Sequence, residues 1–359
     1  MDPALRIGGL PVAQLRAQDA PPAGPAFVEA TVLPGRGMML LQARLRLASG
    51  EVTDALFAPD PAAAARELDG GPEDFAGDKS FSFGGAILAP YANRIRGTPV
   101  EGVREIETQV AGHVVRLPRN WGGKAPRAEQ YAMHGLILHA QVPWRQEAPD
   151  RVSGRLAAGD FGGRWPGRAV LAFEWRLDHG SLRLRVTAEN PGAGPLPMGL
   201  GWHPYFALPS GNRTQARLRL AAASRTLVNN YDEVLPTGTV EAVAGGPYDF
   251  SAPGGRALGE AYLDDCFTDL VRERGAAVAE IFDPAADLGL RIASTAPQVR
   301  AMQVYAPPDK AFVVVEPQFN LADPYGPEWR GRDTGMATIP PGGSLVYEVA
   351  VTAFTLGNR

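Results

Sequence analysis

The chain has 359 residues, 45% of them hydrophobic and 21% charged, which is typical of a globular protein with a sizeable buried core. Its formal net charge of -4 excludes the basic surface with which proteins bind nucleic acids or anionic membranes, and it favours a small neutral ligand. The single cysteine, Cys266, excludes an internal disulfide, and residues 1–6 lack the start of a signal peptide, so we expect a cytoplasmic protein without a membrane span.

The predicted elements are short, and most of them alternate between apolar and polar residues. Such alternation, interrupted by 42 glycines and 33 prolines, is typical of antiparallel strands that bury one face. One helix is predicted at residues 61–68, where a proline occupies the first turn. The continuous apolar run at residues 312–315 predicts a strand buried on both faces. In chain order, the predicted strands are residues 39–47, 172–177, 182–186, 216–220, 302–305, 312–315 and 346–354.

The organisation of the chain indicates a single fold unit. Strands do not alternate with helices, which argues against a parallel α/β sheet. No repeat with a period of about 20 to 50 residues is found, which argues against a propeller or a solenoid. We therefore predict one all-β domain over residues 1–359, a large antiparallel β-sandwich with few short helices.

Two segments each place a titratable side chain among apolar residues. In residues 201–206 (GWHPYF), His203 has aromatic neighbours, which suit the C–H face of a sugar ring or simply fill core. In residues 312–318 (FVVVEPQ), Glu316 ends the apolar run, where a carboxylate needs a partner or a raised pKa. Brought together by the fold, the two would form an acid–base pair; a structural glutamate paired with an arginine is the alternative.

Other candidate residues leave two interpretations open. His134 is either a ligand-binding side chain or a hydrogen-bonded histidine at a strand edge, and Arg94 either reaches a ligand or anchors a loop. Because Asp264 and Asp265 are adjacent, we expect one to face inward and the other to face solvent. No nucleotide, flavin, serine-nucleophile or structural zinc motif occurs, so the sequence indicates no cofactor and no metal.

Taken in order, five motifs resemble the aldose 1-epimerases, or galactose mutarotases. The resemblance runs from about Gly37 to the C-terminus and implies a large β-sandwich. It also implies an isomerase that interconverts the α and β anomers of a hexose or a related aldose by acid–base ring opening and closing. The motifs are NRI at 93–95, HG at 134–135, HPYF at 203–206, LDDCF at 263–267 and VEPQ at 315–318.

The resemblance assigns roles to individual residues. Glu316 matches the general base, His203 the general acid and His134 a second histidine near the ring oxygen. The reaction needs Glu316 ionised while His203 is protonated. From the attraction between the two charges we expect a raised His203 pKa, a lowered Glu316 pKa and a bell-shaped pH profile. The predicted sugar-binding residues are Arg94, Asp264, Asn93, Trp202 and Tyr205.

Departures from the family pattern at residues 136–140 and 319–324 leave the identity of the sugar open. One alternative is an epimerase of a phosphorylated or sulfonated hexose. Another is a non-catalytic carbohydrate-binding protein on the same fold, and a third is a metal site that uses His134, His203 and Asp264. We expect a sugar as the only small-molecule partner and a monomer or homodimer. The basic residues that an anionic sugar would require are Arg94, Arg96, Lys124 and Arg127.

Overall fold

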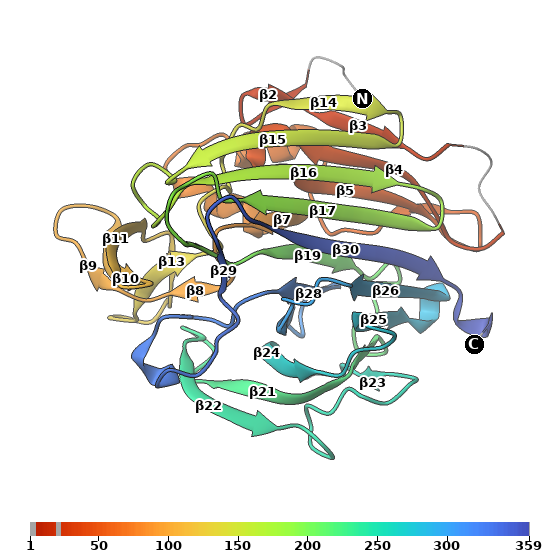
Figure 1. Cartoon of the computed structure of the whole chain (residues 1–359). Helices are drawn as coiled ribbons and strands as arrows, with labels where there is room; N and C mark the ends of the chain where they lie inside the picture. Colours follow the sequence, from red (N-terminus) through yellow and green to blue (C-terminus); the bar gives the residue numbers. More distant parts are fainter. Residues whose placement is uncertain (1–4, 19–22, 359) are drawn as a thin grey trace.

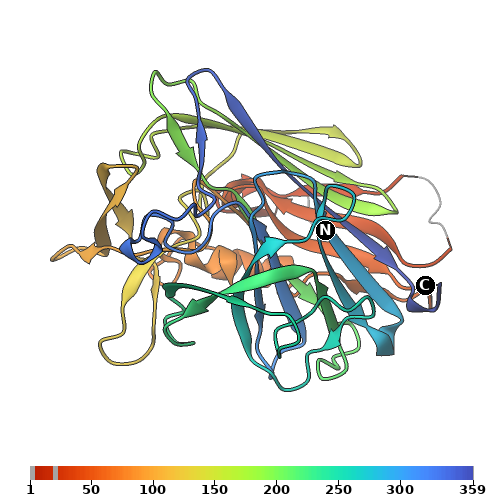
Figure 2. The same ribbon diagram turned by 60° about the horizontal axis from the view of Figure 1, so that its bottom comes forward.

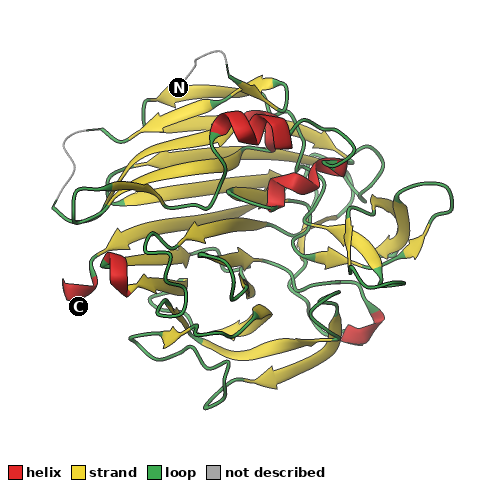
Figure 3. Cartoon of the chain, turned by 180° about the vertical axis from the view of Figure 1, so that it is seen from behind, coloured by secondary structure: helices red, strands yellow, loops and turns green. Residues whose placement is uncertain are grey.

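The computed structural model describes residues 5–18 and 23–358, and strands dominate this part of the chain (Figure 3). Its α-helix, α1 (Pro61–Glu67), confirms the helix predicted at residues 61–68. The side chain of Asp60 caps this helix by accepting hydrogen bonds from the backbone N–H groups of Ala62 and Ala63. The 3-10 helices are η1 (Pro34–Arg36), η2 (Phe75–Phe81), η3 (Pro284–Ala286), η4 (Pro327–Trp329) and η5 (Leu356–Asn358).

An eleven-stranded antiparallel sheet forms one layer of the molecule. Its central strands come from distant parts of the sequence, so β28 lies between β27 and β19. Strand β6 (Val52–Asp54) joins the edge of β5. In spatial order the remaining strands are β22 (Pro236–Ala242), β21 (Ala222–Val228), β24 (Leu263–Leu270), β27 (Ala301–Ala306), β28 (Phe312–Gln318), β19 (Gly201–Ala207), β7 (Gly85–Leu88), β5 (Met39–Arg46), β4 (Ala26–Leu33) and β3 (Ala13–Arg16).

A nine-stranded antiparallel sheet forms the second layer, and Figure 1 shows its strands from β14 to β30 side by side. In β17 the leucines at 182 and 184 are buried while the arginines at 183 and 185 are exposed, as expected for a strand with one buried face. In spatial order the strands are β14 (Trp144–Ala148), β15 (Arg151–Gly159), β16 (Ala169–Leu177), β17 (Ser181–Glu189), β30 (Ser344–Phe354), β26 (Leu288–Ser294), β25 (Ala277–Asp283), β20 (Arg217–Leu220) and β23 (Arg256–Ala257).

Short sheets complete the described part of the chain. The segment from β8 to β13, coloured orange to yellow, lies at one side of the sandwich in both Figures 1 and 2. Two three-stranded sheets make up this segment. The short strands are β1 (Arg6–Ile7), β2 (Leu10–Pro11), β8 (Arg94–Ile95), β9 (Thr98–Pro99), β10 (Glu105–Val110), β11 (His113–Pro118), β12 (Trp121–Gly122), β13 (Gln130–Met133), β18 (Leu196–Met198) and β29 (Ala337–Ile339).

The main hydrophobic core lies between the two large sheets. Trp175 of β16 and Trp202 of β19 meet there edge to face, with ring centroids 5.6 Å apart. The hydroxyl of Tyr347 on β30 donates a hydrogen bond to the carbonyl of Pro317 on β28, which ties the layers together. The predicted all-β sandwich is confirmed, and each of the seven predicted strands overlaps an observed strand.

Strand β28 is buried along its whole length, which confirms the prediction for residues 312–315. Val313 and Val315 contribute to the core between the sheets. Phe312 and Val314 pack in a separate cluster with Tyr205, on the opposite face of the same strand. Glu316 shares this second face by strand alternation. Within the described residues, no helix is long and apolar enough to cross a membrane.

Candidate active site

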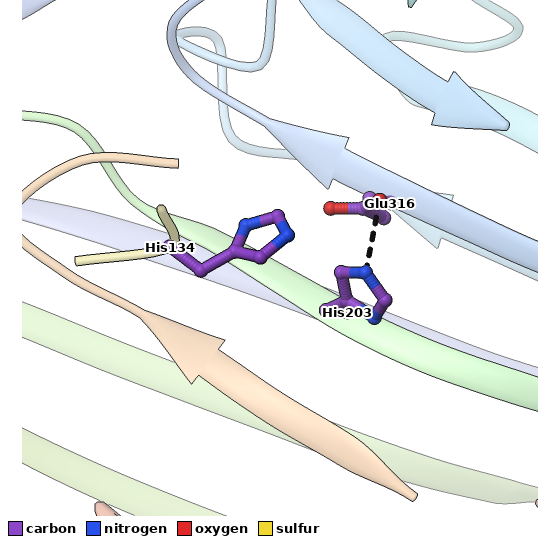
Figure 4. Close-up of side chains that lie close together, drawn as sticks. All are labelled: His134, His203 and Glu316. Atoms are coloured by element: carbon purple, nitrogen blue, oxygen red, sulfur yellow. Dashed lines mark ion pairs between the residues drawn. The ribbon is translucent and has the colours of Figure 1, made fainter. Parts of the chain in front are cut away.

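Glu316 and His203 lie beside each other on neighbouring strands of the eleven-stranded sheet. Strands β19 and β28 are antiparallel with Tyr205 opposite Val314, and this register places His203 opposite Glu316. The Nε2 atom of His203 lies 3.4 Å from Oε1 of Glu316, and both side chains are buried (Figure 4). The pairing that the sequence suggested is therefore present in the fold.

His134 approaches the pair from a different sheet. It directly follows β13, whose last residue, Met133, pairs with Arg94 of β8. Its φ of 63° is in the left-handed region, which is uncommon for residues other than glycine and is found at functional sites. The imidazole lies edge-on to that of His203, with ring centroids 4.7 Å apart. Both of its ring nitrogens are buried without a hydrogen-bond partner among the described residues, so they are available to a ligand.

A hydrogen-bonded network holds Arg94 and Asp264 beside the pair. The guanidinium of Arg94 lies 3.5 Å from Oδ2 of Asp264, and it donates hydrogen bonds to the hydroxyl of Tyr131 and to Oδ1 of Asn93. Gln303 donates to Oδ1 of Asp264 at 2.6 Å and accepts from Nδ2 of Asn93 at 3.1 Å. The network orients a buried cation and a buried carboxylate toward the same space.

Four adjacent strands supply these side chains. Gln303 of β27 pairs with Glu316 of β28, and Cys266 of β24 pairs with Gln303. Because side chains two residues apart on a strand share a face, Asp264 of β24 lies on the same face as Gln303. The eleven-stranded sheet therefore presents Asp264, Gln303, Glu316 and His203 in a row, in the spatial order β24, β27, β28 and β19.

The row lines a cavity of about 500 Å³, a volume within the roughly 300–1,000 Å³ of small-molecule sites. A larger hollow of about 640 Å³ lies elsewhere and is lined by neither histidine nor aromatic side chains. The predicted residues that line the 500 Å³ cavity are Arg94, His134, His203, Tyr205, Asp264 and Glu316. The aromatic residues around them are Phe57, Phe81, Trp121, Tyr231, Tyr262, Tyr305 and Phe312.

Burial controls the protonation of the titratable groups. Desolvation lowers the pKa of His203 to about 3 and lowers the pKa of His134 well below its usual value. Desolvation, and then the nearby Asp264, raises the pKa of Glu316 well above its usual value. The expected shifts were therefore wrong in direction, because desolvation exceeds the attraction between His203 and Glu316. Burial therefore favours the protonated carboxyl of Glu316 and the neutral imidazole of His203.

Trp202 does not contact the cavity, so its predicted role in sugar binding is wrong. Its side chain points to the opposite face of β19 from His203 and packs in the core, where its indole N–H donates to the carbonyl of Gly85. Asn93 is also absent from the cavity lining and instead contacts Arg94 and Gln303. Asn93 therefore positions the network and does not line the cavity.

Asp265 does not face solvent, contrary to the expectation for one of the two adjacent aspartates. It is fully buried, and its carboxylate accepts hydrogen bonds from Arg225 of β21 and from the hydroxyl of Tyr231. Asp264 lies on the cavity side of β24 and Asp265 on the other side. Of the two, only Asp264 is placed to contact a ligand.

The sequence analysis missed Gln303, Tyr131 and the aromatic lining. Gln303 was visible as a polar residue in the predicted strand at 302–305, although nothing local distinguished it from a solvent-facing position. Its role depends on the pairing of β27 with both β24 and β28. Tyr131 and Trp121 come from the short strands β12 and β13, which no local pattern predicted.

The site also offers ligands for a metal ion. One ligand atom from each of His134, His203 and Glu316 lies within 4.8 Å of the others. Two imidazoles and a carboxylate suit zinc. Asp264, which the metal hypothesis used in place of Glu316, is not part of this group. The metal content of the purified protein distinguishes this alternative from metal-free acid–base chemistry.

Solved structures with the same fold support the assignment of the sandwich. A galactose mutarotase-like protein from Clostridium acetobutylicum has a TM-score of 0.72 at 16% identity, and the match covers 92% of this chain and 93% of that one. A GalM/aldose epimerase homologue from C. elegans has a TM-score of 0.71 at 17% identity, covering 96% and 98%. Galactose 1-epimerase from Lactobacillus acidophilus has a TM-score of 0.65 at 18% identity, covering 96% and 99%.

Sequence comparison identifies the family. No curated protein matches the chain. The sequence profile described as aldose 1-epimerase matches residues 59–345, a span that contains the paired histidine and glutamate and every other residue of the cavity named above except Phe57. The chain belongs to the aldose 1-epimerase family.

Proposed function

We propose that the protein is a mutarotase that interconverts the α and β anomers of a neutral aldose by general acid–base catalysis. The observation that carries this proposal is the cross-strand pair of Glu316 and His203 in an aromatic-lined cavity. Aromatic faces suit the C–H face of a pyranose, and the buried Arg94 and Asp264 suit its hydroxyl groups. The membership of the chain in the aldose 1-epimerase family supports the same reaction class.

Ring opening needs one proton removed and another delivered. The carboxylate of Glu316 takes the proton from the anomeric hydroxyl, and the electrons of that O–H bond form the carbonyl at C1. The C1–O5 bond breaks, its electron pair moves to O5, and the imidazolium of His203 protonates O5. Rotation about C1–C2 turns the aldehyde, and the reverse transfers close the ring as the other anomer. His134, with two unpartnered ring nitrogens, helps to hold O5.

The protonation states that burial favours are compatible with these steps. A protonated Glu316 with a neutral His203 carries the same number of protons as a carboxylate with an imidazolium. The Nε2 of His203 and the Oε1 of Glu316 lie 3.4 Å apart, so a modest approach of the two side chains when sugar binds brings them within the roughly 2.6–3.2 Å over which a proton passes directly. The nearby Arg94 acts to lower the pKa of both groups, so it favours the carboxylate form of Glu316 but not the imidazolium form of His203. The pair therefore carries the single proton that the reaction requires, and its two groups can serve as the acid and the base.

The charges at the cavity favour a neutral sugar over a phosphorylated or sulfonated one. Two of the three lysines in the sequence, Lys124 and Lys310, line the cavity. Each has an acidic neighbour, because Asp232 accepts a hydrogen bond from the backbone of Lys124 and Lys310 pairs with Asp309 at 3.2 Å. Of the other basic residues proposed for an anionic sugar, Arg96 pairs with Glu129 and lines a different cavity. Arg127 lines neither that cavity nor the cavity that contains His203 and Glu316.

Polarimetry on freshly dissolved α-galactose and α-glucose tests the proposal. The protein should accelerate the approach to the equilibrium rotation well beyond the spontaneous rate, because positioned proton transfer typically contributes about 10²–10⁴-fold. Free phosphate and methanesulfonate should not inhibit, whereas strong inhibition by either would favour the anionic substrate. Calorimetric binding of a sugar without any acceleration would instead identify a carbohydrate-binding protein and contradict catalysis.

A further inference from the structure

Three carboxylate oxygens in the loop that follows β28 lie buried without a partner. They are Oδ2 of Asp323 and both side-chain oxygens of Glu328, the latter in η4. Asp323 is 3% exposed, and no donor among the described residues reaches any of the three oxygens, so these oxygens of the two carboxyl groups face only each other. Burial of a carboxylate without a partner is unfavourable, so these oxygens need either a proton or a cation.

The three oxygens converge on one point beside Gly326. A side-chain carbon added to Gly326 would lie 2.3 Å from Oε2 of Glu328, 2.4 Å from its Oε1 and 2.4 Å from Oδ2 of Asp323. That point is too close to the Cα of Gly326 to hold an ion itself, but it shows that the three oxygens lie close together. They can ligate a single ion from the side away from Gly326, in a bidentate plus monodentate arrangement. Calcium binds carboxylate oxygens in this manner at about 2.3–2.6 Å.

No guanidinium among the described residues donates a hydrogen bond to these three oxygens, although the charge of Arg96 acts to lower the pKa of Asp323. Arg96, the arginine that faces Asp323, uses its Nε and one terminal nitrogen to donate to Glu129, each at 2.8 Å. A cavity of about 570 Å³ reaches Asp323 and Gly326 and is also lined by the carboxylates of Glu107 and Glu129. Arg116 and Arg96 pair with these two carboxylates, so among the described residues around the cavity the carboxylates left without a cation are those of Asp323 and Glu328, and the cavity gives water a route to complete the coordination of an ion.

We propose that Asp323 and Glu328 bind a Ca²⁺ ion at the edge of this cavity, with Glu328 as a bidentate ligand and Asp323 as a monodentate one. Water supplies the remaining oxygen ligands through the cavity, since calcium takes about six to eight. The site is separate from the row of Asp264, Gln303, Glu316 and His203, and the proposal does not depend on mutarotase activity.

The position of the ion connects it to the backbone that carries Arg94. The N–H of Asp323 donates to the carbonyl of Arg94 at 2.6 Å, and its Oδ1 accepts from the N–H of Arg96 at 3.0 Å. An ion that holds Asp323 therefore holds the backbone of Arg94 and Arg96, on either side of Ile95. Bound calcium stabilises the loop of residues 319–330 against this strand.

Calcium titration of the full chain, freed of metal with EDTA, tests the site. Isothermal calorimetry should show about one bound Ca²⁺ per chain, and the Tm should rise in CaCl₂ relative to EDTA. Mg²⁺ should bind more weakly, because it requires a smaller octahedral site. The absence of binding heat together with an equal Tm in CaCl₂ and EDTA would overturn the proposal. It would mean that Asp323, whose pKa burial raises to about 7, shares a proton with Glu328.

Two isosteric variants and a matched control locate the ion. Glu328→Gln and Asp323→Asn should each lose the calcium-dependent rise in Tm, and Asp323→Asn keeps an oxygen that accepts from Arg96. Glu107→Gln removes the same charge from the same cavity but leaves the three oxygens intact, so it should retain the rise. Retention of calcium binding by both ligand variants would overturn the assignment, and the wild-type comparison remains decisive if either variant does not fold.

Discussion

At the level of single residues, burial decides how His203 and Glu316 are protonated. The exposed fraction of each side chain is only 6% and 2%, so desolvation outweighs their mutual attraction and favours the neutral forms. The pair nevertheless carries one transferable proton between the two groups. Its activity therefore depends on the proton count of the pair rather than on either pKa alone.

The pH profile of mutarotation follows from this proton count. Activity should persist at acidic pH, because His203 with a pKa of about 3 resists a second proton on the pair. It should fall on the alkaline side as pH passes the raised pKa of Glu316, because the pair then lacks an acid. Polarimetry between pH 4 and pH 9, at constant ionic strength, measures the acidic plateau and the alkaline limb. A loss of activity centred near the unperturbed histidine value of 6.5 as pH falls would contradict this assignment.

Gln303 is expected to position Asp264 for the sugar. Gln303→Met keeps the size of the side chain but removes the donor to Asp264 and the acceptor for Asn93. Because hydrogen bonds to charged groups contribute about 1.5–3 kcal/mol, we expect KM to rise roughly 10–100-fold with a smaller change in kcat. The control Gln109→Met changes an exposed glutamine of β10. An unchanged KM in Gln303→Met would exclude the positioning role.

At the level of elements, strand register brings the site together, and register is what the sequence could not supply. The residue types of Glu316, His203 and His134 were sufficient to nominate them. Trp202 was assigned wrongly because β19 is buried on both faces, so hydrophobicity did not reveal which of two adjacent side chains faces the cavity. Asp265 was misjudged for a related reason, since its partner Arg225 comes from a strand about 40 residues away. Pairing between distant strands thus determined which side chains meet at the site.

The capped helix α1 offers a test at this scale. Asp60→Ala removes the acceptor for the N–H groups of Ala62 and Ala63, while the packing of Ala64 in the adjacent cluster is unchanged. We expect a loss of about 1 kcal/mol in the free energy of unfolding, measured by urea denaturation. Asp69→Ala, just beyond the helix, is the control. Equal stability of Asp60→Ala and wild type would show that the cap contributes nothing.

At the level of the whole molecule, the burial of His203 lowers the free energy of unfolding as the pH becomes acidic. The folded-state pKa of His203 lies below its unfolded value of 6.5, so the unfolded chain binds more protons as pH falls between these values. The opposite shift of Glu316 offsets part of this effect above its unfolded value of 4.5. The two-layer architecture and the strand-rich composition were predictable from alternation, whereas this dependence required knowledge of burial. The single domain over residues 1–359 remains a prediction.

His203→Asn isolates the contribution of this histidine. As pH falls from 6 to 4, the free energy of unfolding of the variant should increase relative to wild type by about 1.4 kcal/mol per pH unit. Urea denaturation at pH 7, 6, 5 and 4 measures the difference. His113→Asn, at an exposed position, should track the wild type throughout. A constant difference between His203→Asn and wild type would show that His203 is not shifted.

The central claim, that Glu316 and His203 act together as base and acid, is tested most directly by anomer exchange in NMR. Rates for wild type, Glu316→Gln, His203→Asn and the double variant form one cycle, with Glu51→Gln and His113→Asn as exposed controls. We predict that each single variant loses about 10²–10⁴-fold in kcat/KM and that the double variant loses little more, because the two residues act as a unit. Folded single variants with wild-type exchange rates, or losses that multiply fully in the double variant, would contradict the account.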